Sequence, residues 1–203
     1  MAITLDMRVC ELLTARLCHD LAGPIAAVGN GAELLDDDDP DFVRQAATLI
    51  GDSARTAARR LQLFRFIYGS SAGATAGPPP HSLAGEYFAG TNVACDFPEA
   101  ARNLPSERQR LACNLLLIAA EGLPRGGRVT LEADASAVMA TGDGEGPSAE
   151  TGDALALKTP ADALTSRTVG AYFAGLLAGA LGFRLRVAAQ PGGFRIVCEA
   201  SGA

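Results

Sequence analysis

Hydrophobic residues near the N-terminus recur at intervals of three or four positions, which places them on one side of an α-helix. This apolar stripe consists of Leu13, Leu17, Leu21, Ile25, Val28, Ala32 and Leu35. The pattern predicts a helix over residues 4–35. Pro24 lies inside it and removes one main-chain hydrogen bond. Because the stripe continues beyond Pro24, we expect one kinked helix rather than two helices.

Residues 36–39 are four aspartates, and Pro40 follows them. Carboxylates oppose the dipole at a helix C-terminus. The run therefore predicts a turn, with Asp39 as N-cap and Pro40 in the first turn of the next helix. A metal-binding loop is the alternative, but the run has no glycine and no EF-hand spacing.

A second helix is predicted over residues 41–68. Its apolar positions are Phe42, Ala46, Leu49, Ala57, Leu61, Phe64 and Ile67. The two predicted helices are similar in length and are joined by a short connection, so we expect an antiparallel hairpin over residues 1–70. A hairpin has too little core to bury its apolar seam alone. Pairing of two copies in a four-helix bundle would bury it, so the pattern predicts a homodimer.

Residues 71–80 are rich in small residues and end in three prolines, which predicts a linker. The elements beyond it are shorter. Helices are predicted at 82–89, 105–121 and 165–181, and strands at 92–97, 128–133, 136–141, 183–188 and 193–199. Helices that alternate with mostly adjacent strands predict a two-layer α/β sandwich over residues 81–203. The expected fold class is α+β.

The composition narrows the choice of partners. Of the 203 residues, 48% are hydrophobic and 20% charged, which is typical of a globular protein. The net charge is −6 and Lys158 is the only lysine, which argues against nucleic acid as a partner. Asp6 and Glu11 interrupt the N-terminal residues, so we expect no signal peptide. The uncharged segment 169–183 is too short and too rich in glycine to span a membrane. We therefore expect a cytoplasmic protein with no membrane partner.

His19 stands out as a candidate for chemistry. It falls opposite the apolar stripe, and its neighbours on that side are small residues: Ala15, Ala22, Gly23 and Ala26. The spacing therefore predicts an exposed imidazole. Arg16 is its one long neighbour, and Asp20 follows it directly in the sequence.

Several kinds of site are compatible with a single histidine. A serine-type triad is disfavoured because the sequence has no G-x-S-x-G motif and its only other histidine, His81, lies beside the three prolines. A metal site would need further ligands on the same face, and Cys18 points elsewhere. That His19 is a surface histidine without a functional role stays an open alternative.

Phosphoryl relay is the remaining possibility. Imidazole is a good nucleophile near neutral pH. A relay histidine needs exposure and fixed placement, because a partner protein can supply Mg²⁺ and the acceptor carboxylate. In this interpretation His19 is the phosphoacceptor, Asp20 orients the imidazole or accepts a proton, and Arg16 is a candidate stabiliser of phosphoryl charge.

A family resemblance supports this possibility. Residues 18–25, CHDLAGPI, resemble the phosphoacceptor box of sensor histidine kinases, with a proline five residues after the histidine. Nearly the whole chain resembles the ChpT-type histidine phosphotransferases of alphaproteobacteria. The shared segments are residues 17–21, 23–25, 30–35, 114–117 and 123–127.

The resemblance implies a dimerising hairpin followed by an α/β domain of the GHKL ATPase type, as in histidine kinases. It implies a two-component phosphorelay in cell-cycle control. In such a relay we expect phosphorylation of His19 at Nε2. The implied partners are the receiver domain of a hybrid histidine kinase and the receiver domains of response regulators. These receivers would supply Mg²⁺, and the protein would need no cofactor or metal of its own.

The family's nucleotide-binding motifs are incomplete in this sequence. Aligned on Asn114, the second asparagine of the N box is replaced by Ile118, which cannot ligate a metal. Gly142 stands where an aspartate should contact adenine, although a shift of one residue would bring Asp143 there. The glycine-rich phosphate loop is reduced to residues 167–170. We therefore expect no ATP binding. An active, soluble histidine kinase and a phosphorylation-independent dimeric scaffold are the alternatives.

Overall fold

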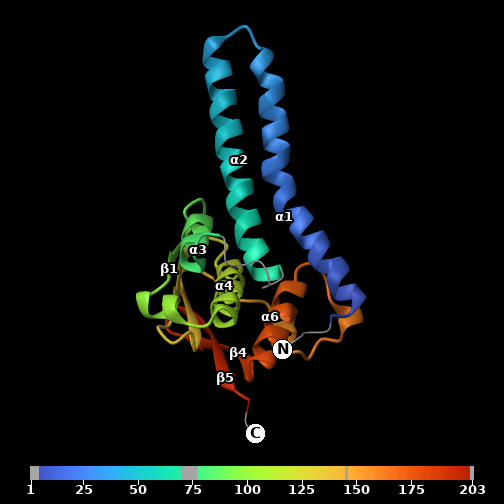
Figure 1. Cartoon of the computed structure of the whole chain (residues 1–203), viewed down its shortest axis with the longest axis vertical. Coiled ribbons are helices and arrows are strands. Elements are labelled where there is room, and N and C mark those ends of the chain that lie inside the picture. The colour runs from blue at the N-terminus through green and yellow to red at the C-terminus, as the bar shows by residue number, and fades with distance from the viewer. Residues whose placement is uncertain (1–4, 70–76, 145, 202–203) are drawn as a thin grey trace.

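The computed structural model describes residues 5–69, 77–144 and 146–201. A long helical hairpin stands on a mixed α/β domain (Figure 1). The hairpin consists of α1 (Met7–Glu33), the 3₁₀ turn η1 (Leu34–Asp36) and α2 (Pro40–Tyr68). The helices of the domain are α3 (Pro80–Phe88), α4 (Ser106–Glu121), α5 (Ala149–Leu155) and α6 (Val169–Ala180), with short 3₁₀ turns η3 (Glu99–Asn103) and η4 (Ala161–Ala163). Its strands are β1 (Val93–Asp96), β2 (Gly127–Leu131), β3 (Ala137–Thr141), β4 (Phe183–Gln190) and β5 (Gly193–Ala200).

The boundaries of the hairpin follow from its capping residues. Asp6 caps α1 by accepting a hydrogen bond from the Arg8 amide at 2.7 Å, and α1 continues through Pro24 as predicted. Asp39 caps α2, with Pro40 as its first residue, which confirms the predicted turn. Residues 71–76 of the predicted linker lie outside the described residues.

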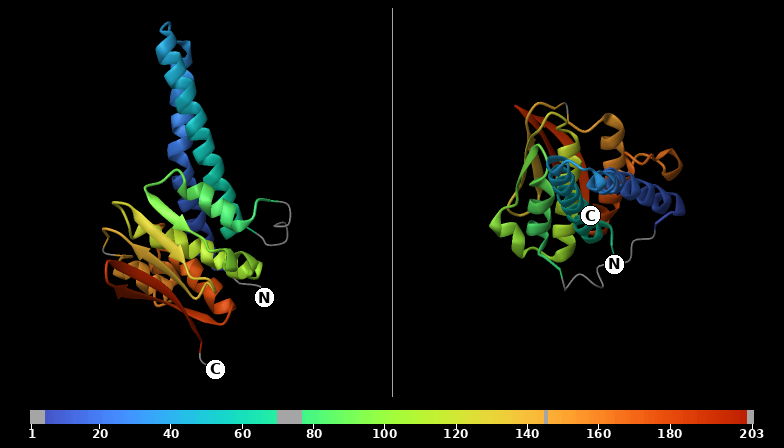
Figure 2. Two further views of the ribbon diagram at one scale, coloured as in Figure 1. Left: turned by 90° about the vertical axis from the view of Figure 1, so that its left-hand side faces the viewer. Right: turned by 90° about the horizontal axis from the view of Figure 1, so that it is seen from above.

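The α/β domain has two layers. Its five strands lie in the order β1-β2-β3-β5-β4, with β1 parallel to β2 and the other neighbours antiparallel. Helices α4 and α6 pack on the sheet (Figure 2). This arrangement confirms the predicted α+β class. The finer resemblance to a GHKL domain stays a prediction.

The base of the hairpin belongs to the core of the α/β domain. The core residues from the hairpin are Val9, Leu12, Leu13, Leu63, Phe64 and Ile67, and they join a cluster that includes Leu116, Val169 and Phe173. Arg110 of α4 completes the junction, since its Nε donates to the Ile67 carbonyl at 2.6 Å and its Nη2 to the Gly69 carbonyl at 3.1 Å. These bonds satisfy carbonyls at the end of α2. The lower hairpin is therefore held against the α/β domain.

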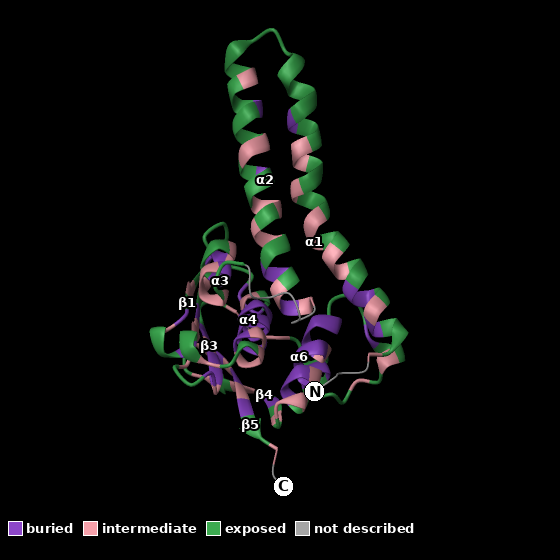
Figure 3. Cartoon of the chain, viewed as in Figure 1, coloured by how far each residue is buried: buried purple, intermediate pink, exposed green. Residues whose placement is uncertain are grey.

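The exposed apolar side chains of the hairpin agree with the prediction that one chain cannot bury them all. Ile25 is 59% exposed, Phe42 50% and Leu61 54%. Much of the surface of both hairpin helices is exposed (Figure 3). Two helices bury only the sides that face each other, and the apolar positions of this hairpin extend beyond those sides. An apolar surface therefore remains uncovered within one chain.

In the part of the chain that the structure describes, every helix is either too short or too polar to cross a membrane.

Leu63 tests the junction between hairpin and domain, because its side chain is fully buried. We expect Leu63→Ala to lower the free energy of unfolding by about 2–5 kcal/mol, since it leaves a cavity in a packed core. Urea unfolding at fixed protein concentration measures the change. Gln62→Ala, at the exposed neighbouring position, should change it by about 0.5 kcal/mol or less. Equal effects of the two substitutions would contradict this packing.

Candidate functional site

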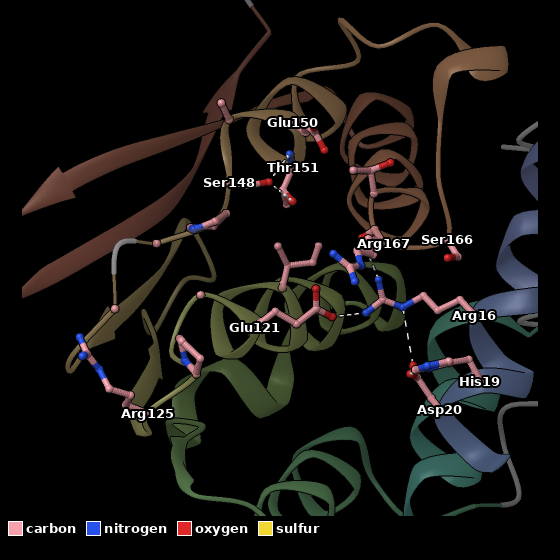
Figure 4. Close-up of a pocket in the computed structure, with 18 of the residues that line it drawn as sticks. Arg16, His19, Asp20, Glu121, Arg125, Ser148, Glu150, Thr151, Ser166 and Arg167 are labelled. Carbon is pink, nitrogen blue, oxygen red and sulfur yellow. Dashed lines mark hydrogen bonds and ion pairs between the residues drawn. The ribbon is translucent and has the colours of Figure 1, made fainter. Parts of the chain in front are cut away.

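His19 lies on α1 at a pocket between the hairpin and the α/β domain (Figure 4). The pocket has a volume of about 1190 Å³, and its walls come from α1, α4, α5 and the segments that precede α5 and α6. The His19 side chain is 88% exposed, as the helical spacing predicts. A molecule that enters this pocket can therefore reach the imidazole.

The structure brings Asp20 and Arg16 together with His19. Oδ1 of Asp20 lies 3.4 Å from Nδ1 of His19, and Oδ2 of Asp20 lies 3.7 Å from Nε of Arg16. Arg60 of α2 donates to the main-chain carbonyl of Asp20 at 2.5 Å. A carboxylate at Nδ1 favours the tautomer with a proton there, which leaves the lone pair on Nε2. The predicted role of Asp20 in orienting the ring fits this geometry.

Arg16 has a different environment from the one expected on an exposed helix face. Its side chain is only 15% exposed, and its Nη2 forms an ion pair with Glu121 at the end of α4. Its Nη1 donates to the Arg167 carbonyl at 3.2 Å. At Gly170 of α6, an added Cβ would lie 3.1 Å from Nη1. The guanidinium therefore fills a space that the absence of a side chain at Gly170 leaves open.

Electrostatics keep this guanidinium charged. Burial by itself lowers the pKa of Arg16, but Glu121, Tyr68 and Asp20 together outweigh burial and raise it. Burial raises the pKa of Glu121, and Arg16 only partly offsets that rise. Glu121 thus holds its charge beside Arg16 at a desolvation cost. Its side chain keeps 44% exposure.

Sequence reasoning did not identify Glu121 as a site residue. It lies 105 positions from Arg16, and in the sequence it is only the last residue of a predicted helix. No local spacing indicates which side chain meets it. The contact exists because the base of the hairpin packs on α4 and α6.

The positions that resemble nucleotide-binding motifs lie at the same pocket or beside it. Ile118 lines the pocket, as do Asp143 and Gly144. Asn114 lies one turn before Ile118 and is fully buried, and its side-chain nitrogen and oxygen have no hydrogen-bond partner among the described residues. Within the same residues, no three His, Cys, Asp or Glu side chains are grouped to hold a metal ion.

Residues 80–193, more than half of the chain, match the family "Histidine phosphotransferase C-terminal domain". The chain belongs to this family.

Two relatives extend the comparison. The chain is 36% identical over 128 residues to the protein phosphotransferase ChpT of Brucella abortus (strain 2308). That match covers 62% of this chain and 60% of the relative, which is less than two thirds of the relative's length. A solved structure described as a bacterial phosphotransferase is similar over 97% of this chain and 98% of its own, with 27% identity and a TM-score of 0.76. The resemblance to ChpT-type phosphotransferases is confirmed.

The stability of the protein should depend on pH, because Tyr68, at the end of α2, is buried in its protonated form. Burial raises the pKa of Tyr68 to about 12, above the ordinary value of about 10. The folded state therefore binds the phenol proton more tightly than the unfolded state does. This contribution to the free energy of unfolding is fully present below about pH 10 and is lost as the pH rises toward 12. We expect the free energy of unfolding to fall more steeply between pH 9.5 and about 11 in the wild type than in Tyr68→Phe. Urea unfolding across this range measures both slopes, and parallel curves would contradict the burial of a protonated phenol.

Proposed function

We propose that this protein is a histidine phosphotransferase that relays a phosphoryl group between aspartates of receiver domains through His19. The observation that carries the proposal is the exposed imidazole with a carboxylate 3.4 Å from Nδ1. Membership of the histidine phosphotransferase family and the name of the Brucella relative support it.

The proposed transfer follows from the geometry of the ring. The Nε2 lone pair of His19 attacks the phosphorus of an aspartyl phosphate on the receiver. The bond between phosphorus and the aspartate oxygen breaks, and the carboxylate leaves with the electron pair. The ring keeps its Nδ1 proton, and Asp20 stabilises the positive charge that develops on the ring. Attack by a second receiver's carboxylate on the phosphoimidazole reverses these steps.

In this proposal the receivers supply Mg²⁺ and the protein binds no ATP. Two features of the pocket support this second point. Ile118 occupies the position of a metal-binding asparagine, and it lines the pocket. Arg16 lies against Gly170 at the start of α6, where the related kinases have their phosphate loop. An ATP-dependent histidine kinase is the alternative.

The proposed partners are the receiver domain of a hybrid histidine kinase, as donor, and those of response regulators, as acceptors. They enter from the sequence resemblance, as does the role in cell-cycle control. We also propose a cytoplasmic location, as expected from the N-terminal residues and from segment 169–183. That Arg16 stabilises the charge of the phosphoryl group also stays a prediction. Two of its nitrogens already have partners, since Nη2 pairs with Glu121 and Nη1 donates to the Arg167 carbonyl.

We further propose a homodimer in which two hairpins form a four-helix bundle. The exposed apolar side chains of the hairpin support it. They are Ile25, Leu34, Leu35, Phe42, Leu49 and Leu61. Burial of such a surface stabilises association by roughly 25 cal/mol per Å² before the costs of binding.

Phosphate transfer to His19 is the first test of this proposal. We expect the protein, mixed with a receiver domain that carries ³²P on its aspartate, to acquire acid-labile phosphate within minutes. His19→Ala should acquire none. His81→Ala removes the only other histidine and should retain uptake.

Incubation with radiolabelled ATP alone is the control for the kinase alternative, and it should label neither the protein nor His81→Ala. Labelling by ATP alone would favour the kinase. Absence of uptake from every cognate receiver, or uptake by His19→Ala, would contradict the relay.

The proposed dimer has a separate test. We expect the double variant Phe42→Glu and Leu49→Glu to sediment as a monomer at a concentration at which the wild type is a dimer, because it places four carboxylates in the proposed bundle. Thr48→Glu, an exposed polar position beside Leu49, should remain a dimer. A monomeric wild type, or an unchanged double variant, would contradict this interface.

A further inference from the structure

A continuous series of polar contacts runs from the α/β domain to the phosphoacceptor (Figure 4). Glu121 of α4 pairs with Nη2 of Arg16. Nε of Arg16 lies 3.7 Å from Oδ2 of Asp20, and Oδ1 of Asp20 lies 3.4 Å from Nδ1 of His19. We propose that Glu121 is a positioning residue for His19, and that it acts by holding Arg16 so that one carboxylate oxygen of Asp20 stays available to the imidazole. This inference rests on the proposed phosphotransfer.

Asp20 needs such support because of its place in the helix. Neighbours in sequence point in different directions on a helix, so an aspartate directly after a histidine does not face it. Residues four apart do face each other, which brings Arg16 to Asp20. Arg60 contacts only the main-chain carbonyl of Asp20. Among these cations, Arg16 is therefore the one that places the carboxylate.

An unrestrained arginine would place that carboxylate badly. Arginine and carboxylate groups prefer a pair with two parallel hydrogen bonds, which would occupy both oxygens of Asp20. Here Nη2 of Arg16 forms an ion pair with Glu121, and Nη1 donates a hydrogen bond to the Arg167 carbonyl. With these contacts in place, Nε is the guanidinium nitrogen that lies near Asp20, 3.7 Å from Oδ2. Oδ1 is left for the ring nitrogen of His19.

The α/β domain fixes the guanidinium on several sides. Besides Glu121 and the Arg167 carbonyl, Gly170 leaves room for it. A Cβ added at Gly170 would lie 3.1 Å from Nη1 of Arg16 and 3.3 Å from the Tyr68 hydroxyl. A domain that lacks a complete nucleotide-binding motif thus has another use, which is to set the orientation of the phosphoacceptor on the neighbouring hairpin.

Glu121→Gln tests this inference, because it removes the charge that competes for Arg16 and leaves Arg16, Asp20 and His19 in place. The matched control is Glu107→Gln. Glu107 also lies on α4, pairs with an arginine (Arg110, 3.4 Å) and has a similar side-chain exposure, 40% against 44% for Glu121.

The first readout is the tautomer of His19, and it needs no phosphate. Nitrogen chemical shifts of ¹⁵N-histidine-labelled protein at pH 8 report which ring nitrogen carries the proton. The chain has two histidines, so His19→Ala assigns the signals. We expect the Nδ1–H form to dominate in the wild type and in Glu107→Gln. In Glu121→Gln we expect a shift toward the Nε2–H form.

The second readout is the rate of phosphate uptake from an aspartyl-phosphorylated receiver. Misplacement of a reacting group by about 1 Å can cost up to about 10²-fold in rate. We expect Glu121→Gln to be slower than the wild type by on the order of tenfold or more. Glu107→Gln should match the wild type.

Gly170→Ala provides a second variant in case Glu121→Gln fails to fold. It displaces the guanidinium without a change of charge, and it should alter tautomer and rate in the same direction by a smaller factor.

The possible outcomes separate this inference from the proposed function. If the wild type takes up no phosphate, the relay is wrong and the tautomer comparison still tests the positioning. An unchanged tautomer in Glu121→Gln would overturn the positioning role, even if the rate changes, because a direct effect of Arg16 on the phosphoryl group would then account for it. A shifted tautomer with an unchanged rate would also overturn it.

Discussion

A charged arginine side chain at the contact between two parts of the fold constrains the rest of this structure. Arg16 extends from the hairpin into the surface of the α/β domain, where it is only 15% exposed. An unpaired charge at such a place would be strongly destabilising. The fold therefore has to provide Glu121, the Arg167 carbonyl and the open space at Gly170 together. Because Arg16 lies one turn before His19 on α1, these contacts also fix the position of His19 at the pocket.

The hairpin divides its functions along its length. Its base is part of the domain core, through residues such as Leu63 and Ile67, and this packing gives His19 a fixed setting. Its upper half presents apolar side chains such as Phe42 to the outside, which fits pairing with a second chain. Between the two, the imidazole is exposed on a helix with small neighbours. A relay histidine needs this combination of rigid placement and free access.

The sequence predicted the features that depend on local spacing. The exposure of His19 follows from the periodicity of its own helix, and the turn at Asp39 and Pro40 follows from capping chemistry. The same spacing does not predict the buried environment of Arg16, since a helical pattern contains no information about the domain that packs on the helix. Its main partner, Glu121, is 105 positions away.

Gly170 shows a further limit of sequence motifs. In the sequence it is interpreted as the remnant of a lost phosphate loop, whereas in the structure the Arg16 guanidinium lies in the space that its missing side chain leaves. The missing information is tertiary, and a single sequence does not contain it. The exposure of Ile25 and Leu61, by contrast, agrees with the prediction that one hairpin cannot bury its apolar positions alone.

The ring nitrogen that carries the phosphate tests the central claim most directly, because it depends both on relay through His19 and on the orientation set by Asp20. The measurement is NMR of ¹⁵N-histidine-labelled protein after phosphorylation by a receiver domain, with the phosphorus–nitrogen coupling used to locate the phosphate. The arrangement of Asp20 and His19 predicts a single phosphohistidine at Nε2 of His19. Phosphate at Nδ1, or on any residue other than His19, would contradict it.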